Sequence, residues 1–216
     1  MWDWEFAYSI LPKLLKVVDV TIEATLSGFV LAALLGMLLA FGRRSKRKPI
    51  AWASGLVVEF IRSTPLLIQL YFLYFALPFY GISLPAFTVG VIGLGLHYST
   101  YLSEVYRAGI ENVPRGQWEA AIALNFSRSQ TWMRIILPQA IRPVVPVLGN
   151  YLITMFKETP LLSTITVVEL MQTAKMIGSQ SFRYLEAFTI AGFLFLLLSY
   201  LSAIWVRRME LRLEQK

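Results

Sequence analysis

Long apolar runs alternate with short polar segments along the chain. Five of these runs are candidates for helices that cross a hydrocarbon core of roughly 30 Å, and they cover residues 21–41, 50–80, 86–106, 140–156 and 185–206. The second run is too long for one straight span, and Pro65 should bend or break it because proline lacks the backbone N–H and restricts the preceding residue. The fourth run is short, and we expect Pro143 and Pro146 to break it. The pattern predicts an all-α, multi-pass membrane protein with about five transmembrane helices.

The segments outside these runs are more mixed. Residues 1–20 alternate aromatic side chains with acids and then place Lys13 and Lys16 beside leucines. This pattern is typical of an interfacial N-terminal segment with aromatic anchors, and a frayed terminus is the alternative. Residues 157–183 are only partly hydrophobic, and we expect them to form an external segment with a re-entrant or pore-lining piece.

Positive charges gather in particular loops. Residues 43–48 hold five of the 20 Lys and Arg residues, the segment after the third run holds five more, and residues 207–216 hold four. Because cytoplasmic loops are enriched in Lys and Arg, this distribution predicts the N-terminus outside and the C-terminus inside. Membrane topology therefore accounts for the basic excess, and nucleic-acid binding is not needed to explain it.

Composition narrows the function classes. A chain with 56% hydrophobic and 15% charged residues is too apolar for a soluble globule. It has no cysteine and one histidine, so we expect no disulfide and no metal site. We find no nucleophile and base in reachable membrane positions and no glycine-rich phosphate loop, so we expect no catalytic residue and no ATP site in this chain. His97 is expected to have a hydrogen-bonded packing role rather than a proton-relay role.

The most polar long segment between the apolar runs reads as a helix, a turn and a helix. Pro114 suits a helix start, and Asn125 suits the left-handed residue that often ends a helix. Ser127 and Gln130 have the spacing of a capping box, which opens the second helix. We expect Pro138 to end that helix.

Ionisable residues within the apolar runs need a partner or water, because a charge in hydrocarbon costs several kcal/mol. Two acid–base pairs have the i, i+3 spacing that lets neighbours on one helix face interact, and we interpret them as structural ion pairs: Glu59 with Arg62, and Glu104 with Arg107.

Three polar residues in and after the fourth run are spaced four apart: Asn150, Thr154 and Glu158. This spacing places them on one helix face. Such a stripe is typical of a solute pathway, and interhelical hydrogen bonding is the alternative.

Residues 119–138 resemble the EAA loop of permease subunits of bacterial ABC importers. They contain Glu119-Ala120-Ala121, a turn residue at Asn125, nine further residues and then Ile135-x-Leu137-Pro138. The family usually has glycine at the position of Asn125, so the turn should persist with a strain of about 1 kcal/mol.

Other segments resemble the polar amino-acid branch of these permeases, which serves histidine, glutamate, glutamine, arginine and opines. They are FIRSTPLLIQL at residues 60–70, residues 101–110 with Glu104, Arg107 and Gly109, VPRGQW at residues 113–118, Gly149-Asn150, and Lys157-Glu158-Thr159. Glu158 stands where the branch usually has aspartate. The chain is also similar to the permeases for ectoine and hydroxyectoine, which belong to this branch.

The resemblance implies a type I ABC importer permease fold in the bacterial inner membrane. Residues 21–211 would form the permease domain, with the coupling loop at about residues 113–138. The implied ATPase-coupling residues are Glu119, Ala120, Ala121, Asn125, Arg115 and Gly116.

The same resemblance implies partners. The chain would form half of a translocation pore with a second permease subunit, as a homodimer or a heterodimer. Two ABC ATPase subunits would carry ATP and magnesium, an extracytoplasmic binding protein would deliver the solute, and this chain would bind no cofactor itself. The alternatives are a membrane scaffold that recruits a cytoplasmic ATPase and a self-sufficient secondary transporter.

Overall fold

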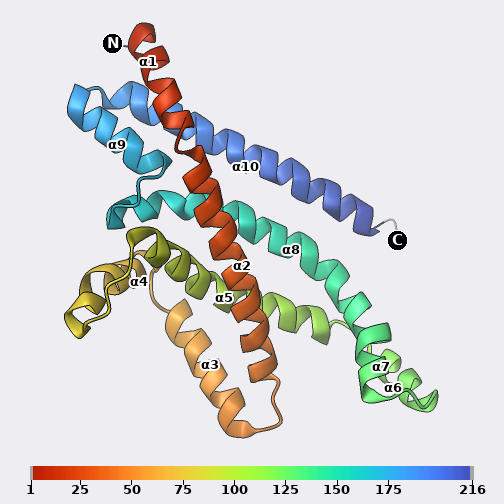
Figure 1. The fold of residues 1–216 in the computed structure, drawn as a ribbon. Coiled ribbons are helices and arrows are strands. Elements are labelled where there is room, and N and C mark those ends of the chain that lie inside the picture. Colours follow the sequence, from red (N-terminus) through yellow and green to blue (C-terminus); the bar gives the residue numbers. More distant parts are fainter. Residues whose placement is uncertain (1, 215–216) are drawn as a thin grey trace.

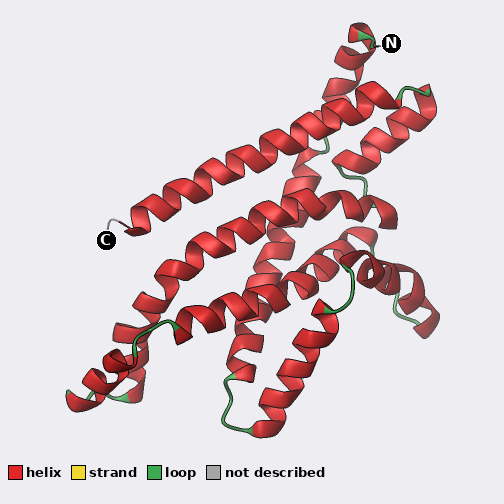
Figure 2. Cartoon of the chain, turned by 180° about the vertical axis from the view of Figure 1, so that it is seen from behind, coloured by secondary structure: helices red, strands yellow, loops and turns green. Residues whose placement is uncertain are grey.

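The computed structural model describes residues 2–214, and within that range the regular elements are all helical (Figures 1 and 2). The α-helices are α1 Trp4–Leu15, α2 Val18–Arg43, α3 Lys48–Arg62, α4 Leu66–Tyr71, α5 Ala86–Glu111, α6 Arg115–Ala123, α7 Arg128–Gln130, α8 Leu137–Glu158, α9 Leu170–Ser181 and α10 Tyr184–Glu214. The remaining elements are the π-helical η1 Phe72–Ala76 and η3 Thr131–Ile136 and the 3₁₀-helical η2 Leu77–Tyr80 and η4 Thr159–Ile165. The all-α prediction is confirmed.

Length and composition identify the helices that could cross a membrane. Two runs qualify among the described residues, Trp4–Arg43 and Tyr184–Arg212. The pair Lys48–Arg62 and Leu66–Tyr80 qualifies only when taken together, because it is bent by 99°. The five-span count and the predicted orientation therefore stay predictions.

The α2–α5 pair is the most extensive helix contact (Figure 1). Small residues bring the two backbones close together: a Cβ placed on Gly36 would lie 2.9 Å from the carbonyl oxygen of Ser99, and one on Gly95 would lie 2.5 Å from Leu31 Cδ2. The absence of a side chain at these two positions therefore allows the close approach, as in other close membrane-helix contacts.

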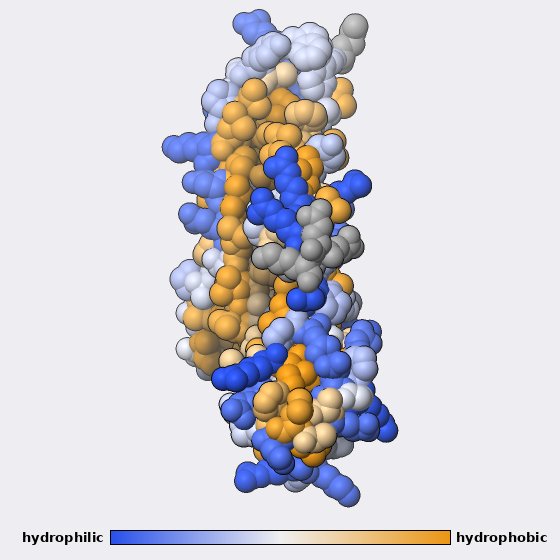
Figure 3. Space-filling model, turned by 90° about the vertical axis from the view of Figure 1, so that its right-hand side faces the viewer, coloured by the Kyte–Doolittle hydropathy of each residue, from blue (hydrophilic) through white to orange (hydrophobic). Residues whose placement is uncertain are grey.

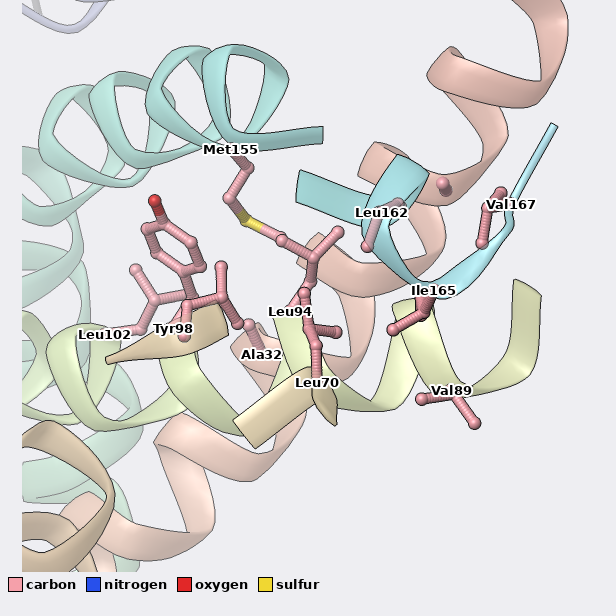
Figure 4. Packing of buried hydrophobic residues seen from close by; sticks show 12 residues of the cluster. Ala32, Leu70, Val89, Leu94, Tyr98, Leu102, Met155, Leu162, Ile165 and Val167 are labelled. Carbon is pink, nitrogen blue, oxygen red and sulfur yellow. The ribbon is translucent and has the colours of Figure 1, made fainter. Parts of the chain in front are cut away.

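The main hydrophobic core surrounds this pair. Figure 4 shows Leu94 of α5 between Leu70 of α4 and Met155 of α8, with Leu162 of η4 beside them. All four side chains are fully buried. The core therefore joins the bent second run, α5 and the end of α8.

Pro65 breaks the second run, as predicted. Residues 63–65 separate α3 from α4. The side-chain amide (Nε2) of Gln69 donates to the backbone oxygens of Ile61 and Thr64 at 2.7 and 3.1 Å. It also donates to the Thr64 hydroxyl at 2.8 Å. A side chain thus supplies hydrogen-bond donors beside the break, where Pro65 has no N–H to offer.

The expected breaks at the later prolines were wrong. α8 runs without interruption through Pro143 and Pro146, and Pro138 lies in its first turn instead of ending a helix. Proline is tolerated at the start of a helix, and the π-helical η3, directly before α8, already interrupts the α-helical hydrogen-bond pattern there. Packing of α8 against α5 and α10 supports the two internal prolines.

The N-terminal segment forms a helix that is tied to the far end of the chain. Asp3 caps α1 by accepting from the Phe6 N–H at 3.1 Å, and it lies 2.6 Å from the Arg183 guanidinium. The Phe6 hydrogen bond and Arg183 together lower the pKa of the Asp3 carboxyl. Trp4 and Tyr8 are exposed on this helix, which suits aromatic anchors at an interface.

Candidate functional site

The predicted polar stripe lies on one side of α8. Asn150 and Thr154 are exposed, and the Thr154 hydroxyl donates to the Asn150 carbonyl oxygen at 2.9 Å. Glu158 is the last residue of α8 and is half-buried. The stripe therefore runs from an open surface to a carboxylate at the edge of the core.

A tyrosine cluster, formed by Tyr98, Tyr101 and Tyr151, lies beside this stripe. The ring centres of Tyr98 and Tyr101 are 6.1 and 5.9 Å from that of Tyr151. Tyr98 and Tyr101 come from α5 and Tyr151 from α8. Sequence reasoning missed the cluster: the i, i+3 spacing on α5 was a local signal, whereas nothing near Tyr151 indicated its contact with α5.

Two polar atoms next to this cluster have no hydrogen-bond partner among the described residues. Glu158 Oε2 and His97 Nδ1 are both buried and unpaired, and Glu158 lies within electrostatic range of both His97 and Tyr98. The His97 ring packs against Tyr98 and Tyr101 at 5.6 and 5.4 Å. His97 therefore has the expected packing role but no hydrogen bond at Nδ1. An unpaired buried carboxylate oxygen is costly, so it marks a place where a donor is needed.

Arg62 differs from its prediction. No ion pair joins it to Glu59 among the described residues, and its guanidinium instead lies 5.5 Å from the centre of the Tyr101 ring. Both charged side chains are exposed on α3, where an ion pair contributes little. The contact of Arg62 with an aromatic face on α5 is therefore favoured over an ion pair with Glu59. This contact brings a positive charge to the tyrosine cluster.

Glu104 and Arg107 are paired, with Arg107 Nη2 2.7 Å from Glu104 Oε2. The pair belongs to a larger network. Glu104 also binds Arg43 at the end of α2, and Arg107 binds Glu111 at 2.9 Å. The network joins α2 to the last turns of α5, directly before the segment at residues 113–138. Spacing along one helix could not predict Arg43, which is 61 residues from Glu104.

Residues 115–136 have the predicted local structure. α6 follows Pro114, and Asn125 has the left-handed φ of 55°. The N–H groups of Phe126 and Asn125 donate to the carbonyl oxygens of Ala121 and Ile122, which is the Schellman pattern. Both hydrogen bonds of the Ser127–Gln130 capping box are present.

An aromatic contact holds the two helices of this pair together, and a buried apolar cluster attaches the pair to the bundle. The Trp118 and Trp132 rings meet edge to face at 5.3 Å, and Gln139 donates to Gln117 at 3.2 Å. The fully buried Ile136 lies in the hydrophobic cluster beneath them. The pair therefore projects from the bundle as one packed unit (Figure 1).

The predicted coupling residues fall into two groups. Four of them are exposed: Arg115, Gly116, Glu119 and Ala120. Asn125 is exposed in the turn, whereas Ala121 is fully buried. Ala121 faces its own chain and cannot enter a partner's groove directly, because the inward side of α6 packs on η3.

Apolar side chains that the sequence reasoning did not select complete the outward surface of this unit. Ile122 is 72% exposed, Leu124 is 68% exposed and Met133 is 64% exposed. Figure 3 shows an apolar area surrounded by hydrophilic residues at the lower end of the molecule, where Figure 1 places α6 and α7. An exposed apolar area with a polar rim is typical of a protein interface.

No cluster in the described part of the chain brings together three or more metal-ligating His, Cys, Asp or Glu side chains. The polar and aromatic groups beside α8 and the unit at residues 115–136 are therefore the two candidate sites.

The chain belongs to the family of binding-protein-dependent transport system inner membrane components, which it matches over residues 32–215. It is a multi-pass permease subunit of a type I ABC importer of the bacterial inner membrane. Such subunits are not catalytic, and a separate ATPase hydrolyses the ATP.

Its relatives are amino-acid permeases. It is 45% identical to a probable amino-acid ABC transporter permease of Sinorhizobium fredii, over 98% of this chain and 91% of the relative. It is 36% identical to an L-cystine transport system permease of Bacillus subtilis, over 88% and 83% of the two chains.

A solved structure of an amino acid ABC transporter with histidines matches 98% of this chain and 99% of that one, with a TM-score of 0.93 and 32% identity. The MetNI methionine ABC transporter shares the fold, with a TM-score of 0.71 and 20% identity over 93% and 94% of the two chains.

Proposed function

We propose that this chain forms half of a translocation pore that carries polar amino acids or related zwitterions, with solute contacts at Asn150, Thr154 and Glu158. The observation that carries this proposal is the buried, unpaired oxygen of Glu158 beside the tyrosine cluster. A buried carboxylate requires a compensating positive charge, and the ammonium group of an amino acid would supply it. The relatives' description as amino-acid permeases supports the same solute class.

Neighbouring groups fit a zwitterion. Tyrosine faces attract cations, and the tyrosine cluster adjoins Glu158. Arg62 brings a guanidinium over the Tyr101 ring, where it would attract the solute carboxylate. A second permease subunit would cover this open face of α8. The exposed Asn150 and Thr154 would then line the path by which the solute reaches Glu158.

The unit at residues 115–136 would couple this pore to ATP hydrolysis. We propose that Ile122 and Leu124 enter a groove on an ABC ATPase subunit, with Glu119 and Arg115 pairing with charges at its rim. Ala120 and Gly116 permit close approach, whereas Ala121 and Asn125 maintain the shape of the unit from inside. Closure of two ATPase subunits around ATP and magnesium would then move α5 and α8 through the packed Trp118–Trp132 contact.

The proposed assembly has two permease subunits, two ATPases and an extracytoplasmic solute-binding protein. ATP and magnesium would bind to the ATPases, and this chain would need no cofactor. Ectoine is the narrower solute proposal. Solute-stimulated ATP hydrolysis by the reconstituted assembly separates these proposals. Stimulation by ectoine alone supports an ectoine permease, and stimulation by amino acids supports the wider solute class. ATP hydrolysis that no solute stimulates favours a membrane scaffold.

The solute site is tested with Glu158→Gln in the same assembly. A charge-assisted contact contributes about 1.5–3 kcal/mol, so the apparent KM for uptake should rise by about tenfold or more. Glu59→Gln is the matched control, because Glu59 is an exposed glutamate with no ion pair among the described residues. Equal KM values for the two variants would exclude a direct solute contact at Glu158.

The coupling surface is tested with Ile122→Asp. A charge at this exposed apolar position should abolish co-purification of the ATPase while the permease still enters the membrane. Phe79→Asp is the control, because Phe79 is 91% exposed on η2, far along the chain from the coupling unit. Normal ATPase recovery with Ile122→Asp would refute the proposed contact.

A further inference from the structure

The hairpin between α2 and α3 ends in a group of exposed positive charges. We call three exposed residues at this end the basic tip: Lys46, Arg47 and Lys48. Among the side chains that the structure describes, residues 2–212, no carboxylate lies within ion-pairing distance of them. The preceding Arg43 is bound to Glu104. Arg44 lies 3.5 Å from Glu111, so the nearby acids are already paired.

Exposed apolar side chains border the basic tip. Trp52 is 71% exposed and lies four residues after Lys48, on the same face of α3. Phe41 is 51% exposed on α2 and Ile50 is 43% exposed on α3. Leu38, at 66% exposure, continues this apolar surface along α2. The positive charges therefore lie at the end of an apolar, lipid-facing surface, at the level where tryptophan marks the membrane–water interface.

We propose that the basic tip binds the headgroups of anionic phospholipids. Ammonium and guanidinium groups bind phosphate, and clusters of Lys and Arg next to a transmembrane helix attract acidic lipids. The bordering Trp52 and Ile50 favour lipid over an acidic protein surface, because acyl chains cover apolar side chains beside the headgroup. Figures 1 and 2 show the hairpin end apart from α6 and α7, which leaves it outside the proposed ATPase contact.

Trp52 provides a direct test. The complete importer, with its ATPase, is reconstituted in phosphatidylcholine vesicles that contain the same fraction of brominated phosphatidylglycerol or brominated phosphatidylcholine, with bromine near the headgroup. Subtracting the signal of Trp52→Phe isolates the quenching of Trp52. Because each basic residue near an acidic surface contributes about 1 kcal/mol, the brominated anionic lipid should quench at least about threefold more strongly.

The charge variant combines Lys46→Gln, Arg47→Gln and Lys48→Gln. In this variant the two brominated lipids should quench the fluorescence of Trp52 equally. The matched control neutralises three basic residues at the end of α10, namely Arg207, Arg208 and Arg212, and should keep the preference. Equal quenching in the unmodified importer would overturn the proposal, as would a preference that survives the charge variant. Weak quenching by both lipids in the complete importer, restored when the ATPase is omitted, would also overturn the proposal, because protein would then cover the tip.

Discussion

Replacement of Gly36 by alanine tests the close packing of α2 on α5. The new Cβ would lie 2.9 Å from the Ser99 carbonyl oxygen, 3.0 Å from Leu102 Cβ and 3.2 Å from the Ser103 nitrogen. Two of these three atoms belong to the backbone, so a side-chain rotation cannot relieve the contact and the helices must separate. Overpacking of this kind costs about 1–3 kcal/mol, and the better helix propensity of alanine returns at most about 1 kcal/mol.

Gly55→Ala is the matched control, because a Cβ at that position in α3 would have no described atom within 4 Å apart from its own neighbouring helix backbone. It should gain about 0.5–1 kcal/mol from helix propensity alone. We therefore expect the two variants to differ by about 2 kcal/mol in their free energy of unfolding, measured by denaturant titration in detergent micelles. A Gly36→Ala protein as stable as Gly55→Ala would refute the packing argument.

Three further predictions concern single residues. Asn125→Gly should keep or raise the free energy of unfolding, because glycine adopts the left-handed backbone without strain. Asn125→Ala should lower that free energy by about 1 kcal/mol, and denaturant titration of the two variants measures the difference. Glu104→Gln should cost about 1–2 kcal/mol on the same titration, because Arg43 loses its carboxylate and Arg107 keeps only Glu111. Asp3 has a lowered pKa when folded, so its stabilisation is present above the unfolded value of 3.8 and is lost as pH falls through the folded pKa. Asp3→Asn should therefore remove part of the fall in Tm below pH 4, and an unchanged Tm profile would contradict the assignment.

Local patterns predicted the local structure well. The turn at Asn125, the capping box at Ser127 and the break at Pro65 each depend on a few adjacent residues, and the structure confirms all three. The unbroken course of α8 was not predictable in this way. Pro143 and Pro146 disfavour a helix locally, and the support from α5 and α10 that offsets them appears only after the helices are packed.

The candidate sites show the same division. The spacing of Asn150, Thr154 and Glu158 was visible in the sequence, but Tyr151 meets the α5 tyrosines only through the tertiary fold. For residues 115–136 the sequence indicated two helices, while the inward direction of Ala121 depends on how α6 packs on η3. Contacts between distant segments, such as Arg43 with Glu104, were beyond any argument from spacing along one helix.

The side chain of Gln69 has a mechanical consequence. A proline bend is usually regarded as a place where a helix can flex. Here the side-chain amide of Gln69 in α4 donates to Ile61 at the end of α3 and to Thr64 in the connection between the two helices. Opening or closing the 99° angle would stretch these bonds. We therefore expect α3 and α4 to move as one rigid unit, so that a displacement of the hairpin end also displaces α4 in the core.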